Sequence, residues 1–136
     1  MTITVDTSVW LPMLADKSGK VAAAIRAAAG DEPLVMSPLV RMELLQGCRG
    51  DTHWNIVSGR LDVVPLLSIS PDTWDLAARL YFDLRQNGAT VHSAVDCCIA
   101  QLALMHDCTL IHNDRDFEVI AAIRPLKHRR LDLSKV

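Results

Sequence analysis

The chain alternates between short runs of consecutive apolar residues and longer stretches in which apolar residues recur every three or four positions. The short runs at 3–5, 34–36 and 108–111 are typical of strands buried on both faces. A further run, 63–69, is interrupted by Pro65, and we expect it to include a strand as well. These runs predict the strands of a sheet whose faces are both covered.

The periodic stretches that separate these runs predict helices. We expect them at 8–14, 21–29, 38–46, 51–61, 71–86, 94–105 and 117–123. Ser8, Ser18 and Ser37 are the expected N-caps, and residues 126–133 are expected to form a short strand or a tail. Because strands and helices alternate over the whole length, the sequence predicts an α/β fold, a three-layer α/β/α sandwich around a mostly parallel sheet.

Length and composition limit the organisation of the chain. With 136 residues, half of them apolar and 22% charged, residues 1–136 are expected to form one globular domain. No apolar stretch is long enough for a membrane span, and the N-terminus has neither a basic start nor a small-residue cleavage site. We therefore expect no membrane segment, no signal peptide and a cytoplasmic location.

The cysteines and the net charge exclude little. Cys48, Cys97, Cys98 and Cys108 form no CxxC pair, so we expect buried reduced thiols and no zinc site. A net charge of −2 gives no global argument for a nucleic-acid partner, although local patches matter more than the total.

Candidate chemistry comes from four carboxylates. Asp6 directly follows the first strand run, Asp114 follows the run that ends at Ile111, and Glu43 and Asp96 lie in apolar helical stretches. The carboxyl ends of parallel strands open on one crevice, so these acids are expected to converge there. Converging carboxylates repel one another unless a cation lies among them, and oxygen ligands are those that Mg²⁺ or Mn²⁺ prefers.

Each acid also has a local interpretation. Asp6 can form a turn or a cap, Glu43 can be a solvated helix residue, and Asp96 can be a first-turn acid favoured by the helix dipole. Asp114 is the expected ligand of the last segment, with Asp116 as an accessory ligand or a cap. Taken together, the acids predict a site for one or two cations that orient a phosphodiester, generate hydroxide from bound water and stabilise the leaving oxygen.

Four segments in order resemble the motifs of a known family. They are Thr4-Val5-Asp6-Thr7-Ser8, Arg41-Met42-Glu43, Asp96-Cys97-Cys98-Ile99-Ala100 and Asn113-Asp114-Arg115-Asp116-Phe117. Together they resemble PIN-domain ribonucleases, and their order and spacing are most similar to the VapC toxins of bacterial toxin–antitoxin pairs. One departure is visible, because the last motif often starts with Thr and this chain has His112.

The resemblance implies a function and a site. Asp6, Glu43, Asp96 and Asp114 would take the acidic metal positions, with Asp116 as an accessory and Ser8 near the metal through a water. Members of the family usually cleave RNA with Mg²⁺ or Mn²⁺. The toxins form homodimers and are silenced in a hetero-oligomer by a VapB antitoxin, whose C-terminal segment covers the active site.

Two other functions stay open at this point. One is a catalytically inactive module that binds only RNA or protein, and the other is a phosphohydrolase of the haloacid-dehalogenase type. The latter needs a second Asp two residues after the first, where this chain has Ser8. Arg41, Arg115, Lys127 and Arg129 are candidate phosphate contacts, with a solvated surface as the alternative.

Overall fold

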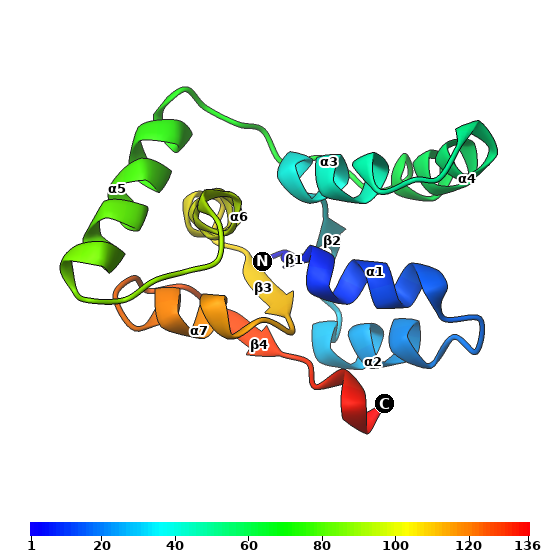
Figure 1. The fold of residues 1–136 in the computed structure, drawn as a ribbon. Helices are drawn as coiled ribbons and strands as arrows, with labels where there is room; N and C mark the ends of the chain where they lie inside the picture. The colour runs from blue at the N-terminus through cyan, green and yellow to red at the C-terminus, as the bar shows by residue number, and fades with distance from the viewer.

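A four-stranded parallel sheet lies at the centre of the computed structural model, which describes all 136 residues (Figure 1). The strands are β1 (Ile3–Val5), β2 (Leu34–Val35), β3 (Thr109–His112) and β4 (His128–Arg130), in the order β2-β1-β3-β4. All three strand pairs are parallel, and Val5 at the end of β1 is in register with Ile111 in β3. The residues that follow the two central strands therefore emerge side by side.

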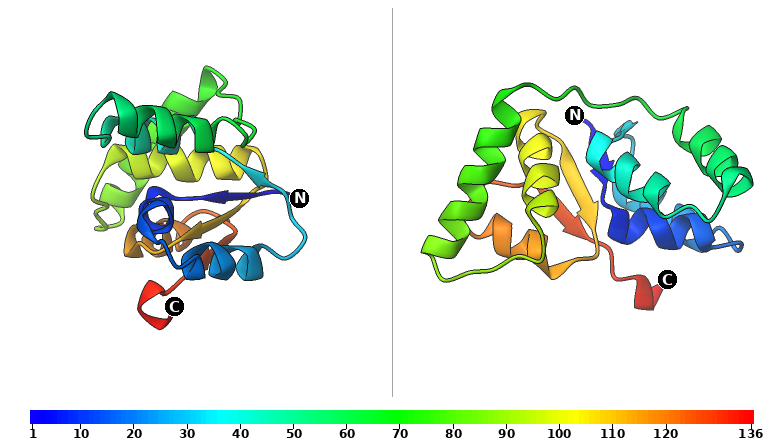
Figure 2. Two further views of the ribbon diagram at one scale, coloured as in Figure 1. Left: turned by 90° about the vertical axis from the view of Figure 1, so that its right-hand side faces the viewer. Right: turned by 45° about the horizontal axis from the view of Figure 1, so that its top comes forward.

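Seven α-helices cover the sheet and confirm the predicted α/β sandwich. They are α1 (Thr7–Ala15), α2 (Lys20–Ala29), α3 (Pro38–Gln46), α4 (Asp51–Leu61), α5 (Asp72–Gln86), α6 (Ala94–Met105) and α7 (Arg115–Ala121); a 3₁₀ turn (Leu133–Lys135) follows β4. In the views of Figures 1 and 2, α6 and α7 lie on one side of the sheet, with α5 outside α6, and α1 and α2 lie on the other. No helix combines the length and the apolar character needed to cross a bilayer.

The helix starts show how the local sequence positions the acids. The side chain of Asp6 caps α1 by accepting from the backbone N–H of Ser8, and that of Asp114 caps α7 by accepting from the N–H of Asp116. The prediction of Ser8 as the first cap was therefore wrong, because Asp6 already accepts the N–H two residues ahead. For the same reason α7 begins at Arg115, two residues earlier than expected.

The segment 63–69 forms no strand of the sheet. It contributes only one isolated parallel bridge, between Met36 and Leu66. Pro65 has no N–H to donate to a strand ladder, and Val63 is 82% exposed, so this segment crosses the surface. Ser37 does occupy the N-cap position of α3, but its hydroxyl is buried and has no hydrogen-bond partner.

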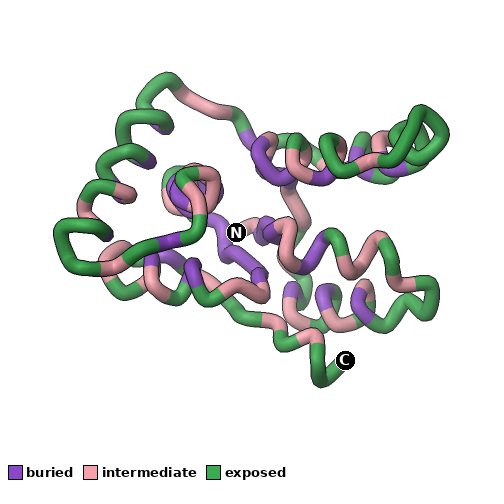
Figure 3. Tube along the Cα trace, in the orientation of Figure 1, coloured by how far each residue is buried: buried purple, intermediate pink, exposed green.

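The core is continuous around the two central strands (Figure 3). Every residue of β1 and β3 is buried, including the polar Thr4, Thr109 and His112. The next layer is α6, in which most residues from Cys97 to Ala103 are buried. Helix α5 packs on α6 through its buried residues, which recur every three or four positions. Cys97 and Cys108 are buried and Cys48 and Cys98 half-buried, all four as free thiols.

This packing predicts the effect of a change in α6. Leu102 is completely buried, so Leu102→Ala should lower the free energy of unfolding by about 2–5 kcal/mol, because it leaves a cavity. The matched control is Leu76→Ala on α5, where the side chain is 44% exposed and the change should stay within about 0.5 kcal/mol. Urea unfolding of both variants measures the difference; equal losses would contradict the assignment of α6 to the core.

Candidate metal centre

Three acids from two helices converge beyond the carboxyl end of β3. Asp96 lies in the first turn of α6, Asp114 is the N-cap of α7, and Asp116 lies in the first turn of α7. One carboxylate oxygen of each lies within 4.8 Å of the others. This spacing is compatible with one cation contacting all three.

Asp6, at the end of β1, lies outside this group of three but is near enough for its charge to raise the pKa of Asp96. Its side chain is almost completely buried, and its Oδ2 accepts two hydrogen bonds from Ser8, from the backbone N–H at 3.0 Å and from the hydroxyl at 2.6 Å. The Ser8 hydroxyl in turn accepts from the backbone N–H of Asn113 at 3.0 Å. Ser8 thus links the loops that follow the two central strands, and it contacts Asp6 directly.

Glu43 is connected to this cluster through Thr7. The Thr7 hydroxyl donates to Glu43 Oε1 at 2.8 Å, which ties α3 to the first residue of α1. The negative charge of Glu43 is one of the causes that raise the pKa of Asp6. Glu43 lies outside the group of three acids that are within 4.8 Å of one another, at the Asp6 side of the site. Thr7 was missed by the sequence reasoning, although it directly follows Asp6.

Asp116 also has a structural contact. Its Oδ2 accepts from the backbone N–H of His92 at 2.6 Å, so it holds the segment that leads into α6. Because Asp96 follows four residues later, this bond couples the positions of the two acids. Asp116 is buried and faces Asp96, whereas the capping role that was considered for it belongs to Asp114.

The electrostatics of the cluster show that the acids are difficult to ionise together. Burial, the charges of Asp6 and Asp114 and a hydrogen bond with Asp116 raise the pKa of Asp96 to about 8. Burial is also the main reason that the pKa of Asp6 is raised. A divalent cation would stabilise the ionised acids, and a set of carboxylate and hydroxyl oxygens is the donor chemistry that Mg²⁺ or Mn²⁺ takes. The residues present therefore fit such a cation.

His112, at the end of β3, lies directly beneath Asp114. Its ring is completely buried, its Nδ1 accepts from the backbone N–H of Asp114 at 3.2 Å, and its Nε2 is 2.9 Å from Nδ1 of His128. Burial is the main cause that lowers the pKa of His112 to about 4. The ring is therefore neutral at physiological pH.

The four basic residues considered as phosphate contacts differ in whether their side chains already have a partner within the protein. Arg41 pairs with Asp62 of the α4 end at 2.8 Å, Lys127 pairs with Asp107 at 2.8 Å, and a guanidinium nitrogen of Arg129 donates to the Ala28 carbonyl. Lys127 precedes β4 and lies at the opposite end of the sheet from the acids. Only Arg115, between Asp114 and Asp116, is exposed and has neither an ion pair nor a hydrogen-bond partner for its guanidinium.

Known proteins are similar to this chain in sequence and in fold. A family model for the PIN domain matches residues 3–123. Ribonuclease VapC11 of Mycobacterium tuberculosis is 33% identical over 129 residues, which cover 92% of this chain and 96% of that protein. Ribonuclease VapC17 of the same species is 29% identical over 94 residues, 68% of this chain and 71% of that protein.

Two solved structures show the same fold. VapBC2 from Rickettsia felis, bound to a DNA fragment from its promoter, superposes with a TM-score of 0.76 at 19% identity, covering 97% of this chain and all of that one. VapBC-1 from nontypeable Haemophilus influenzae superposes with a TM-score of 0.74 at 21% identity, covering 96% and 98%.

The two shifted pKa values predict how stability depends on pH in metal-free protein. Folding raises the pKa of Asp96 from 3.8 to about 8, so the folded state holds the proton more tightly and its stability falls as pH rises through that range. Folding lowers the pKa of His112 from 6.5 to about 4, so that residue has the opposite effect between those values. Between pH 6.5 and 8 the effect of His112 fades and that of Asp96 dominates, and Asp6, whose pKa burial also raises, acts in the same direction as Asp96.

Chemical denaturation with chelator should therefore show stability falling from pH 6.5 to 8. Asp96→Asn should flatten this slope, because the amide carries no charge at either pH. Asp75→Asn, which changes an exposed acid in the first turn of α5, is the matched control and should keep the slope. An unchanged slope in Asp96→Asn would contradict the account of the cluster.

Proposed function

Because this chain belongs to the PIN-domain family and, within it, to the VapC ribonucleases, we propose that it is a metal-dependent endoribonuclease that acts as the toxin of a toxin–antitoxin pair. The observation that carries the proposal is the convergence of Asp96, Asp114 and Asp116 within 4.8 Å. Asp6 and Glu43 complete an acidic site at the end of the sheet where the loops after β1 and β3 meet.

The acids of the cluster would hold the cation. We assign Asp6, Asp96 and Asp114 as ligands, Asp116 as an accessory ligand and Glu43 as the acid at the Thr7 side of the site. When bound, Mg²⁺ or Mn²⁺ lowers the pKa of a coordinated water and stabilises the charge that develops on the phosphodiester. Ser8 orients Asp6 and would contact the cation through a water.

The chain's own residues would also place the substrate. Arg115 lies between two of the acids and has no ion-pair partner, so it is the side chain best placed to contact an RNA phosphate. Arg41 and Arg129 could do so by exchanging their present partners, Asp62 and the Ala28 carbonyl. Lys127, which is paired with Asp107 at the other end of the sheet, has the weakest support.

An RNA cleavage assay tests the proposal. Purified protein, freed of any partner, should cut total cellular RNA into discrete fragments with Mg²⁺ or Mn²⁺ and should stop when chelator is added. Asp6→Asn and Asp96→Asn should each lower the rate by at least about a hundredfold, because loss of a ligand costs more than loss of a residue that only orients one. Asp75→Asn should cleave like the natural protein.

The same assay separates the alternative functions. A folded protein that binds RNA but cleaves none with either metal would favour the inactive binding module. Release of inorganic phosphate from small phosphomonoesters without RNA cleavage would favour the phosphohydrolase, although Ser8 occupies the position where that chemistry needs an Asp. Full activity in both Asn variants would overturn the site assignment.

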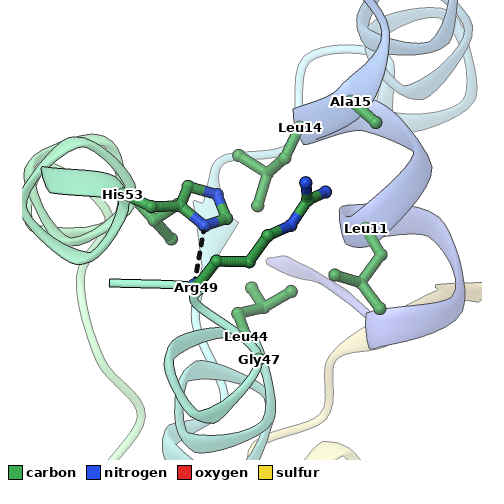
Figure 4. Close-up of a pocket in the computed structure, with 8 residues that line it drawn as sticks. Leu11, Leu14, Ala15, Leu44, Gly47, Arg49 and His53 are labelled. Atoms are coloured by element: carbon green, nitrogen blue, oxygen red, sulfur yellow. Dashed lines mark hydrogen bonds between the residues drawn. The ribbon is translucent and has the colours of Figure 1, made fainter. Parts of the chain in front are cut away.

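A cleft between α1, α3 and α4 is a candidate binding site for a segment of a partner protein (Figure 4). It has a volume of about 240 Å³, its walls carry Leu11, Leu14, Leu44 and Val57, and its mouth carries Arg49 and His53. In Figure 4 the Arg49 side chain extends from the loop between α3 and α4 toward α1, and its backbone N–H donates to His53 at 3.1 Å. We propose that an apolar segment with acidic residues, from a VapB-like antitoxin, binds here.

Substitutions at exposed leucines test this surface. Leu11→Glu should weaken co-purification with the cognate antitoxin by at least about tenfold, because it places a carboxylate in the apolar cleft. Leu66→Glu introduces the same charge at a leucine of similar exposure that lies outside the cleft and outside α5, and it should leave the complex intact. The RNA cleavage of both variants should be unchanged; normal antitoxin binding by Leu11→Glu would exclude this cleft.

We also propose that two copies of this chain form a homodimer. Exposed apolar side chains of α5, namely Trp74 and Phe82, support a contact on that side of the molecule. Sedimentation equilibrium of the partner-free protein measures the mass, and a monomer at micromolar concentration would contradict this part.

A further inference from the structure

The loop that carries Asp114 is held through its backbone by two side chains. The N–H of Asn113 donates to the Ser8 hydroxyl at 3.0 Å, and the N–H of Asp114 donates to Nδ1 of His112 at 3.2 Å. Asp114 in turn accepts from the N–H of Asp116 at 2.9 Å. The direction in which the Asp114 carboxylate points therefore depends on the acceptor that His112 presents.

The His112 ring is held in place by the rings packed against it and by a contact at each of its two nitrogens. It is completely buried, and its centroid is 5.1 Å from that of the Phe117 ring and 5.1 Å from that of the His128 ring. Nδ1 accepts a backbone N–H, so the ring proton must be on Nε2, and this nitrogen donates to Nδ1 of His128 at 2.9 Å. The two contacts together specify one tautomer and one orientation.

We propose that His112 is a positioning residue that fixes Asp114 in the acidic cluster, and that His128 keeps its ring in the tautomer this requires. The inference rests on the proposed function, since the purpose of the fixed Asp114 is to bind the cation. Neither histidine is proposed to touch metal or substrate. Their effect is on the backbone N–H of Asp114 itself, which donates to the His112 ring two residues earlier in the chain.

Two substitutions at His112 separate positioning from packing. His112→Asn retains an acceptor oxygen on Cγ, where the imidazole has Nδ1, but loses the group that reaches His128. His112→Gln retains a polar group near the Nε2 position and is closer to histidine in volume, but has no acceptor at the Nδ1 position. If His112 only fills space, Gln should therefore be tolerated at least as well as Asn.

The readouts are Mn²⁺ affinity, from titration calorimetry, and hydrogen exchange of the Asp114 amide, from NMR, both on the full chain freed of any partner. We expect His112→Gln to weaken Mn²⁺ binding by about ten- to hundredfold and to lose protection of the amide. We expect His112→Asn to stay within about threefold of the natural protein and to keep this protection. Equal effects of the two variants, or a larger effect of Asn, would overturn the proposal.

If His112→Gln does not fold, two variants of the half-buried His128 test the proposal instead. His128→Asn keeps an acceptor at the δ1 position and should bind Mn²⁺ normally, whereas His128→Phe removes it and should weaken binding. Equal binding by this pair would overturn the role of His128. If the natural protein itself binds no Mn²⁺, the nuclease proposal fails, and the exchange of the Asp114 amide still decides whether His112 holds the loop.

Discussion

The mutual repulsion of buried carboxylates is the constraint on which the rest of this structure depends. Asp6 and the segment from His112 to Asp116 follow adjacent central strands, so the parallel register of β1 and β3 forces their acids together. Asp96 joins them from α6, in surroundings where ionisation is so unfavourable that its pKa rises to about 8. Such an arrangement lowers the stability of the free protein, and the proposed cation would relieve the repulsion.

Neutral groups hold these acids in place without neutralising them. Ser8 donates to Asp6, Thr7 donates to Glu43, and backbone N–H groups donate to Asp114 and Asp116. Each of these contacts orients a carboxylate and leaves its charge available for the proposed cation. This explains why the strong ion pairs of the chain, such as Arg124 with Asp83 and Arg130 with Glu118, lie outside the cluster.

The sequence predicted the parts of the fold that local patterns determine. Mostly apolar runs identified β1 and β3 because both strands are buried on both faces, and the predicted helix over 94–105 was confirmed as α6. The segment 63–69 was assigned wrongly, because its apolar residues read like a strand although Pro65 and exposure keep it out of the sheet.

At the site, the sequence could indicate which acids share an edge but not what holds them. The bonds from Thr7 to Glu43 and from Asn113 to Ser8 join residues 36 and 105 positions apart, and no local pattern encodes them. The same is true of the contact between His112 and His128, although the unusual His112 was visible as a departure from the motif.

The most direct test of the account is the number of protons released when Mn²⁺ binds at pH 7. Titration calorimetry in buffers of different ionisation enthalpy measures this number. Because Asp96 is protonated in the free protein and must ionise to become a ligand, we expect the release of about one proton by the natural protein and close to none by Asp96→Asn. Binding of Mn²⁺ without proton release, or no binding at all, would contradict the claim that a cation relieves the repulsion within this cluster.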